Sequence, residues 1–129
     1  MAKSNKPTAA ELEILDVLWS RGRASVREIF DDLRVRRAVS YTTVLKLLQI
    51  MHEKGLVKRD EKGKAHIYRA AQTQTQTQRK LVSDLLDRAF RGSALKLVQQ
   101  VLETKPTSRE ELDAIRRMID EAREKRGKK

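Results

Sequence analysis

One stretch of the sequence places polar side chains at a spacing suited to hydrogen bonding with nucleic-acid bases. On a helical period of about 3.6 residues, one face of residues 40–55 is polar. This face carries Thr42, Lys46, Gln49 and Glu53, with Thr43 beside them near the start. Such groups can hydrogen-bond base edges or phosphates. The same spacing also describes an amphipathic helix whose outer face is only solvated, so it leaves both interpretations open.

The same stretch has the features of a complete helix with a buried side. Its apolar residues recur at i, i+3, i+4 and i+7, which predicts one stripe facing a core; they are Val44, Leu47, Leu48 and Met51. Ser40 suits the N-cap, and Gly55 can take the left-handed conformation that ends a helix. We therefore expect this helix to pack on one face and to present the other.

Cations are clustered on both sides of the central helix. The sequence has a net charge of +11, which suits a polyanionic partner. We expect a basic turn at residues 34–39 and a basic hairpin tip to hold phosphates through Arg36, Arg37, Lys58, Lys62 and Lys64. The other expected DNA-binding residues are Ser40, Tyr41, Thr42, Thr43 and Lys46. Two roles stay open for Tyr41: packing under the turn, or hydrogen bonding to a phosphate.

Two capping boxes precede the central helix and predict the elements that support it. Thr8 with Glu11 opens a helix over residues 9–20, whose apolar positions include Trp19. Ser25 with Glu28 opens a shorter helix through about Leu33.

After Gly55 the period changes to two residues, which predicts strands at 56–60 and 65–69 joined by a turn at 61–64. Val57 and Ile67 are expected to face the helices. Three helices followed by a basic hairpin predict a winged helix-turn-helix.

The second half of the chain is predicted to be helical. Residues 72–78 alternate Gln and Thr, and we interpret them as a hinge between a DNA-binding domain at 1–71 and a helical domain at 72–129. A strand is the alternative, but neither of its faces would be apolar. Helices are expected at about 79–90, after Ser93, and after the capping box that starts at Ser108.

These helices are too short to enclose a core of their own, so we expect a homodimer that packs helix against helix. The expected dimerisation residues are Leu81, Leu85, Phe90, Leu112, Ile115 and Ile119. The predicted fold class is thus mostly α with a small β-hairpin wing, in which an N-terminal winged helix-turn-helix precedes a C-terminal helical dimerisation domain.

Composition excludes several other classes. The 129 residues contain no Cys, which excludes disulfides and thiolate metal sites. No apolar run approaches the roughly 20 residues needed to cross a bilayer, so we expect a cytoplasmic protein without membrane insertion. The two His and the scattered acidic residues form no metal or acid/base constellation. We expect no cofactor and no enzyme activity.

Several motifs together resemble the penicillinase-repressor (BlaI/MecI) family. The resemblance is strongest over residues 8–69 and extends into the second half of the chain. It rests on Thr8-Ala9-Ala10-Glu11-Leu12-Glu13-Ile14-Leu15, Val17-Leu18-Trp19, Val26-Arg27-Glu28, Tyr41-Thr42-Thr43-Val44, Glu53-Lys54-Gly55-Leu56-Val57, Tyr68, Asp87-Arg88-Ala89-Phe90 and Gly92-Ser93. It implies a dimeric transcriptional repressor bound to a pseudo-palindromic double-stranded DNA operator.

The resemblance also implies a route of derepression. In antibiotic-responsive members a membrane sensor leads to cleavage within the dimerisation domain, at an Asn-Phe pair that aligns with Gln100-Val101 here. The departure from Asn-Phe leaves two alternatives, a sensor protease of different specificity or induction by another route. Copper-responsive relatives carry a C-terminal cysteine cluster, which this sequence lacks.

Two other function classes share some of these features. A sequence-independent architectural binder of DNA or RNA would have the same charge, although a winged helix suits base readout better. A protein-interaction module built on a winged helix would not retain DNA at moderate salt.

Overall fold

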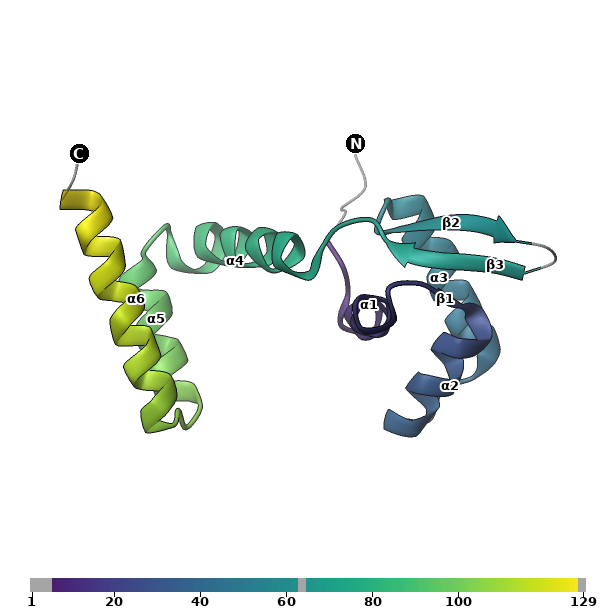
Figure 1. Ribbon diagram of the computed structural model, residues 1–129, viewed down its shortest axis with the longest axis horizontal. Helices are drawn as coiled ribbons and strands as arrows, with labels where there is room; N and C mark the ends of the chain where they lie inside the picture. Colours follow the sequence, from purple (N-terminus) through teal and green to yellow (C-terminus); the bar gives the residue numbers. More distant parts are fainter. Residues whose placement is uncertain (1–5, 63–64, 128–129) are drawn as a thin grey trace. The chain divides into compact units, whose positions relative to one another are not determined.

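The computed structural model describes residues 6–62 and 65–127. The chain divides into two compact units, Met1–Val82 and Ser83–Lys129. It is mostly helical with one small antiparallel sheet, which confirms the predicted fold class (Figure 1). Among the described helices, none is long and apolar enough to cross a membrane.

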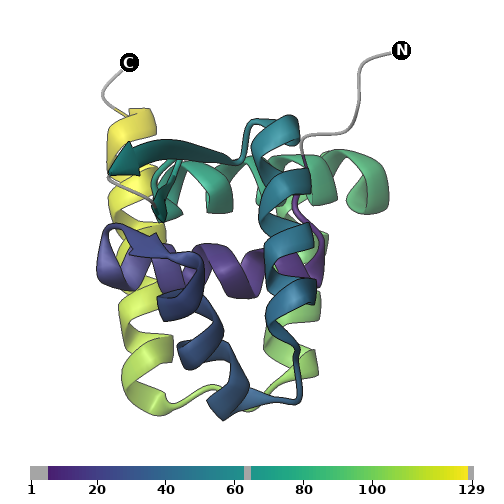
Figure 2. The ribbon, with the colours of Figure 1, turned by 90° about the vertical axis from the view of Figure 1, so that its right-hand side faces the viewer.

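The first unit contains three helices and the sheet. Its elements are α1 (Ala9–Arg21), β1 (Ala24–Ser25), α2 (Val26–Arg36), α3 (Tyr41–Lys54), β2 (Val57–Lys62) and β3 (Ala65–Ala70). Both capping boxes predicted for this unit form, at Thr8 and at Ser25. Ser40 caps α3, and Gly55 ends it with a φ of 81°, a left-handed conformation that glycine adopts without strain. Figure 2 shows α2 and α3 joined by a short connection, with α1 crossing behind them.

The helix α2 is longer than predicted and changes where the arginines lie. It continues to Arg36, so Arg34 and Arg36 belong to its last turn and not to the following turn. Cations in the last turn of a helix are stabilised by the partial negative charge at its C-terminus. The apolar pattern alone did not reveal that the helix continues to these arginines. The connection to α3 is therefore only residues 37–40.

The sheet has a third strand that the sequence did not predict. The strand order is β1-β3-β2, with the short β1 pairing antiparallel to β3. Val57 lies opposite Ala70, whereas Ile67 lies opposite Asp60. Since opposed residues share a face and neighbours alternate, Val57 and Ile67 face opposite sides of the sheet, so the prediction that Ile67 faces the helices was wrong.

Among residues 66–70 of β3, Tyr68 is the buried one, with 1% of its surface exposed. Of the turn predicted at 61–64, Glu61 and Lys62 belong to β2, while Gly63 and Lys64 lie outside the described residues.

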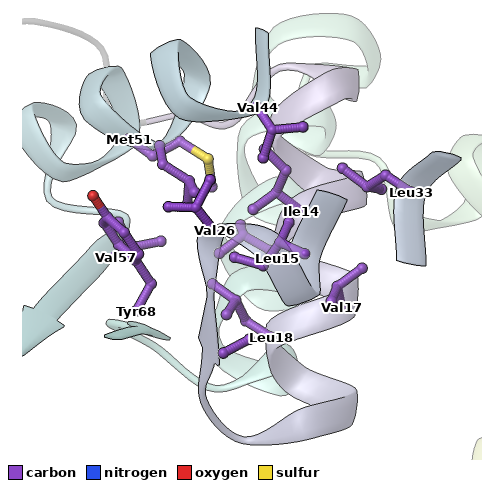
Figure 3. Close-up of a cluster of buried hydrophobic side chains, with 13 residues drawn as sticks. Ile14, Leu15, Val17, Leu18, Val26, Leu33, Val44, Met51, Val57 and Tyr68 are labelled. Carbon is purple, nitrogen blue, oxygen red and sulfur yellow. The ribbon is translucent and has the colours of Figure 1, made fainter. Parts of the chain in front are cut away.

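A single aliphatic core holds the first unit together (Figure 3). It combines Ile14, Leu15, Val17 and Leu18 of α1 with residues from every other element of the winged helix. From α3 it takes Val44, Leu48 and Met51, each fully buried. Fully burying one such side chain stabilises the fold by about 1.5–3 kcal/mol. The inner face of α3 is therefore fixed, and its outer face is held in one orientation.

The remaining helices are α4 (Gln74–Phe90), α5 (Ala94–Thr104) and α6 (Arg109–Gly127). The predicted hinge at 72–78 was wrong over Gln74–Gln78, because these residues form the first turns of α4. Thr73 and Gln76 make a reciprocal capping box, with Gln76 N–H donating to Thr73 Oγ1 at 3.1 Å and Thr73 N–H donating to Gln76 Oε1 at 2.9 Å. Trp19 Nε1 also donates to the Gln72 carbonyl at 2.9 Å, which ties the preceding residue to α1.

Thr73→Ala is expected to destabilise the first unit by about 1 kcal/mol, because it leaves an N–H group at the start of α4 unsatisfied. Urea unfolding followed by the fluorescence of Trp19, the only Trp, measures this loss. Thr75→Ala is the matched control, since Thr75 lies inside the same exposed helical turn. An equal effect of both substitutions would show that the capping box is not responsible.

The second unit buries little of its apolar surface. No residue of α5 or α6 is buried, and all residues of both helices are described. Ser93 caps α5, and Ser108 accepts a hydrogen bond from Glu111 N–H at 3.1 Å at the start of α6. α6 extends through Gly127, so Lys125 and Arg126 belong to its last turn.

Candidate nucleic-acid interface

The outer face of α3 presents the predicted polar side chains. Thr42, Lys46, Gln49 and Glu53 are all exposed, on the side opposite the buried core residues of the same helix. The side chain of Lys46 makes no hydrogen bond or ion pair with any described residue. Ile50, which the pattern of polar residues did not single out, is an exposed apolar residue one turn after Lys46. This face can therefore offer donors, acceptors and an apolar group to a ligand.

The start of α3 is organised by hydroxyl groups. Ser40 Oγ accepts from Thr43 N–H at 3.1 Å and lies 2.8 Å from Thr43 Oγ1. An open hollow is lined there by Arg37, Ala38, Val39, Ser40 and Thr43. The hydroxyls of Ser40 and Thr43 thus stabilise the helix end and also border this surface hollow.

Two of the predicted phosphate ligands are paired with carboxylates of α1. Arg36 Nη1 lies 3.2 Å from Asp16 Oδ2, and Arg37 Nη2 lies 3.0 Å from Glu13 Oε1. All four side chains are at least one-third exposed, so each pair contributes at most about 1 kcal/mol. The pairs nevertheless orient both guanidinium groups toward α1 and neutralise them locally.

A second pair of arginines, Arg27 and Arg34, lies beside α3. The sequence analysis included Arg34 only within the basic turn at residues 34–39 and did not single out Arg27. The guanidinium carbons of Arg27 and Arg34 lie 5.7 and 5.5 Å from the centre of the Phe30 ring. The ring of Tyr41 packs edge-on against Phe30, with 5.8 Å between centroids. The i, i+3, i+4, i+7 spacing of Arg27, Phe30, Asp31 and Arg34 on one helical face is the signal that could have revealed this cluster.

The described part of the wing also carries cations. Lys58 and Arg59 of β2 are exposed. Asp60 pairs with Arg23 at 3.5 Å and with Arg69 at 3.9 Å. The side chain of Lys62 and the whole of Lys64 lie outside the described residues, so their predicted phosphate contacts stay predictions.

A buried ion pair joins the first turn of α1 to the last turn of α3. Lys54 Nζ donates to Glu11 Oε1 at 2.6 Å and to the Lys6 carbonyl at 3.0 Å, with side-chain exposures of 13% for Lys54 and 2% for Glu11. Burial opposes ionisation of Glu11, but hydrogen bonds from Lys54 and Thr8 outweigh it and lower the Glu11 pKa. The pair fixes both ends of the supporting helices.

The described residues contain no group of three or more His, Asp or Glu side chains arranged to hold a metal ion. The distinctive features of the first unit are instead an exposed polar helix face and the cations around it. This arrangement suits binding to a polyanion through many weak contacts.

Comparison with known proteins agrees with this geometry. The sequence profile described as penicillinase repressor matches residues 7–121. The chain belongs to the penicillinase repressor family.

The relatives are similar over nearly their full lengths. The methicillin resistance regulatory protein MecI of Mammaliicoccus sciuri is 21% identical over 118 residues, which cover 92% of this chain and 96% of that protein. Transcriptional regulator BlaI of Mycobacterium tuberculosis (strain ATCC 25618 / H37Rv) is 31% identical over 122 residues, covering 94% and 88%. A solved structure of the DNA recognition and protein interaction domains of HOP2 overlaps 44% of this chain and 91% of its own, at 28% identity and a TM-score of 0.41, which is too low to bear on function.

Two separated motifs of the penicillinase repressor family meet at the Glu11–Lys54 pair. Glu11 belongs to the motif at residues 8–15, and Lys54 belongs to the motif at residues 53–57. The contact between them gives these motif residues a physical role in holding α3 against α1. The sequence showed both residues but not their contact.

The remaining predicted site residues lie on α4 to α6. Leu85, Leu112 and Ile119 are exposed, and Leu81, Phe90 and Ile115 are half-buried. Gln100 and Val101 are exposed within the regular helix α5. The Gln100 carbonyl also accepts a hydrogen bond from the Thr104 hydroxyl. Because the Gln100-Val101 bond lies within a regular helix, a protease would have to unwind this helix before cutting it.

Proposed function

We propose that this member of the penicillinase repressor family is a sequence-specific DNA-binding transcriptional repressor. It acts as a homodimer on a pseudo-palindromic operator. The observation that carries the proposal is the outer face of α3, which is polar and exposed while its inner face is locked into the core. The relatives MecI, a methicillin resistance regulatory protein, and BlaI, a transcriptional regulator, support the same function.

In this proposal α3 enters the major groove. Thr42, Thr43 and Lys46 approach base edges, while Ser40, Tyr41 and Lys58 lie close to the backbone beside the groove. Lys62 and Lys64 of the wing contact phosphates, as do arginines near the end of α2, for which Arg36 and Arg37 are the residues expected from sequence. Base contacts specify the site, and phosphate contacts position the protein on it.

The dimer is supported by the apolar side chains that one copy leaves uncovered. Leu85 of α4 is 46% exposed and Ile119 of α6 is 51% exposed. Neither α5 nor α6 has a buried apolar residue. A second copy would cover these faces, with Leu81, Phe90, Leu112 and Ile115 completing the contact. A dimer would then place two copies of α3 on half-sites about one helical turn apart, or a multiple of that distance.

Derepression follows from loss of that dimer. Two linked DNA-binding domains bind more tightly because binding of the first raises the effective concentration of the second. Cutting the link therefore lowers the affinity for the operator by a factor of about 100 or more. One route is cleavage at Gln100-Val101 by a membrane sensor or its protease, with a specificity that differs from that for Asn-Phe. The other route is induction without cleavage. Mass spectrometry of the repressor in induced cells distinguishes them, because fragments ending at Gln100 require the first route.

Lys46→Ala tests base readout. The operator is first selected from a random DNA pool by the full chain. The substitution is expected to weaken the binding free energy for this operator by about 1–3 kcal/mol and to relax the base preference at one position in each half-site. Lys58→Ala is the control, since loss of a phosphate contact weakens binding to all sequences alike. Selection of no common sequence by the wild-type chain, or no retention of DNA at moderate salt, would contradict the proposed function.

A further inference from the structure

We propose that Arg27 and Arg34, braced against Phe30 and Asp31, form the phosphate-binding pair at the edge of α3, in place of Arg36 and Arg37. This inference rests on the proposed function, since it names the residues through which the proposed repressor contacts the DNA backbone. The four arginines lie on or directly after α2, but their surroundings differ.

The first difference is how each guanidinium is held. Arg27 and Arg34 are braced on the face of Phe30 at 5.7 and 5.5 Å, and their Nε atoms lie 3.6 and 3.7 Å from Asp31 Oδ1. Their side chains are nevertheless 67% and 57% exposed. A guanidinium can stack on an aromatic ring and still use its planar N–H groups to bind a phosphate. The cluster therefore restrains two cations without covering them.

The second difference is local charge. Arg27 and Arg34 share one carboxylate, that of Asp31, whose Oδ1 is buried and accepts no hydrogen bond. Arg36 and Arg37 each have a carboxylate of their own on α1, at 3.2 and 3.0 Å. The first pair keeps an excess positive charge, and the second pair is neutralised. A phosphate is attracted to the pair with the excess charge.

The third difference is position. The edge-on contact between Phe30 and Tyr41 places this face of α2 beside the first residue of α3. The ion pair of Arg36 with Asp16 shows that the end of α2 turns another face toward α1. When α3 lies in a groove, the neighbouring helix crosses the backbone. Arg27 and Arg34 are therefore on the side of α2 that adjoins the start of α3, and Phe30 is their positioning residue.

Two charge-matched double variants test the inference. Arg27→Ala/Arg34→Ala and Arg36→Ala/Arg37→Ala each remove two positive charges per chain from α2 or the residue that follows it, so a general effect of net charge is equal in both. The dissociation constant for the selected operator is measured for the full chain from 50 to 200 mM KCl, with circular dichroism to verify folding. Each phosphate contact contributes about 0.9 to the magnitude of the slope of log K against log salt. Because the proposed dimer would lose two contacts per chain, the first variant should reduce this magnitude by about 3.6. The second should leave the slope unchanged.

A third variant separates charge from folding. Arg27→Lys/Arg34→Lys retains both charges and should keep the wild-type slope. If the alanine variant lost its slope because it misfolded, restoring the charges with Lys would not restore the slope. An unchanged slope in Arg27→Ala/Arg34→Ala, or an equal fall in both alanine variants, would overturn the assignment to Arg27 and Arg34. Failure of the wild-type chain to bind DNA would instead contradict the proposed function itself, and the two failures are thus distinguishable.

Discussion

Leu85→Asp is expected to separate the proposed dimer into monomers and to weaken operator binding by about 100-fold. The substitution would place an unpaired carboxylate in an apolar contact, which costs several kcal/mol unless water reaches it. A monomer has only one DNA-binding domain, so it loses the gain in affinity that comes from the high effective concentration of the second domain in the dimer. Sedimentation equilibrium reports the change in mass, and titration of the operator reports the change in affinity.

Ser83→Asp is the matched control for Leu85→Asp. It adds the same charge to an exposed polar position of α4, about 160° around the helix from Leu85. This control should remain a dimer with wild-type affinity. A Leu85→Asp protein that sediments as a dimer and binds as tightly as wild type would show that α4 does not contribute to the contact.

Lys54→Met is expected to destabilise the first unit by about 3–5 kcal/mol, because it leaves the buried Glu11 carboxylate without its cation. Urea unfolding by Trp19 fluorescence measures the loss. Glu11→Gln/Lys54→Met removes both charges and should recover most of the stability, since no buried ion is left unpaired. If the double variant were as unstable as Lys54→Met, lost packing and not the unpaired charge would be the cause.

The pair also predicts a dependence on pH. The pKa of Glu11 is lowered in the folded chain, so its contribution to stability is fully present above the unfolded value of about 4.3. That contribution is lost as pH falls through the lower, folded pKa. The stability advantage of wild type over Glu11→Gln should therefore shrink below about pH 4 and stay constant toward neutral pH.

Local rules predicted most of the helices. The caps at Thr8, Ser25 and Ser40 and the αL glycine at Gly55 lie where the sequence placed them, since capping depends on residues three or four positions apart. The hinge prediction failed because the Gln/Thr repeat was interpreted from its composition. The Thr73-Gln76 pair within it obeys the same capping rule and starts α4.

The polar face of α3 was predictable for the same local reason, but the partners of the charged residues were not. Lys54 and Glu11 are 43 positions apart, and Arg36 and Asp16 are 20 apart. Only the packing of α2 and α3 on α1 brings them together. A count of cations therefore predicted Arg36 and Arg37 as phosphate ligands without showing their neighbouring carboxylates.

The poorly buried helices α5 and α6 have a consequence for the lifetime of the protein in the cell. If the proposed dimer forms, a newly made chain would display exposed apolar side chains, including Leu95 and Met118, until it met a second copy. Quality-control proteases act on polypeptides that open or fold incompletely, so their access would fall as pairing proceeds. Turnover would then be faster when the protein is scarce, and the cellular amount of repressor would rise more steeply than its rate of synthesis.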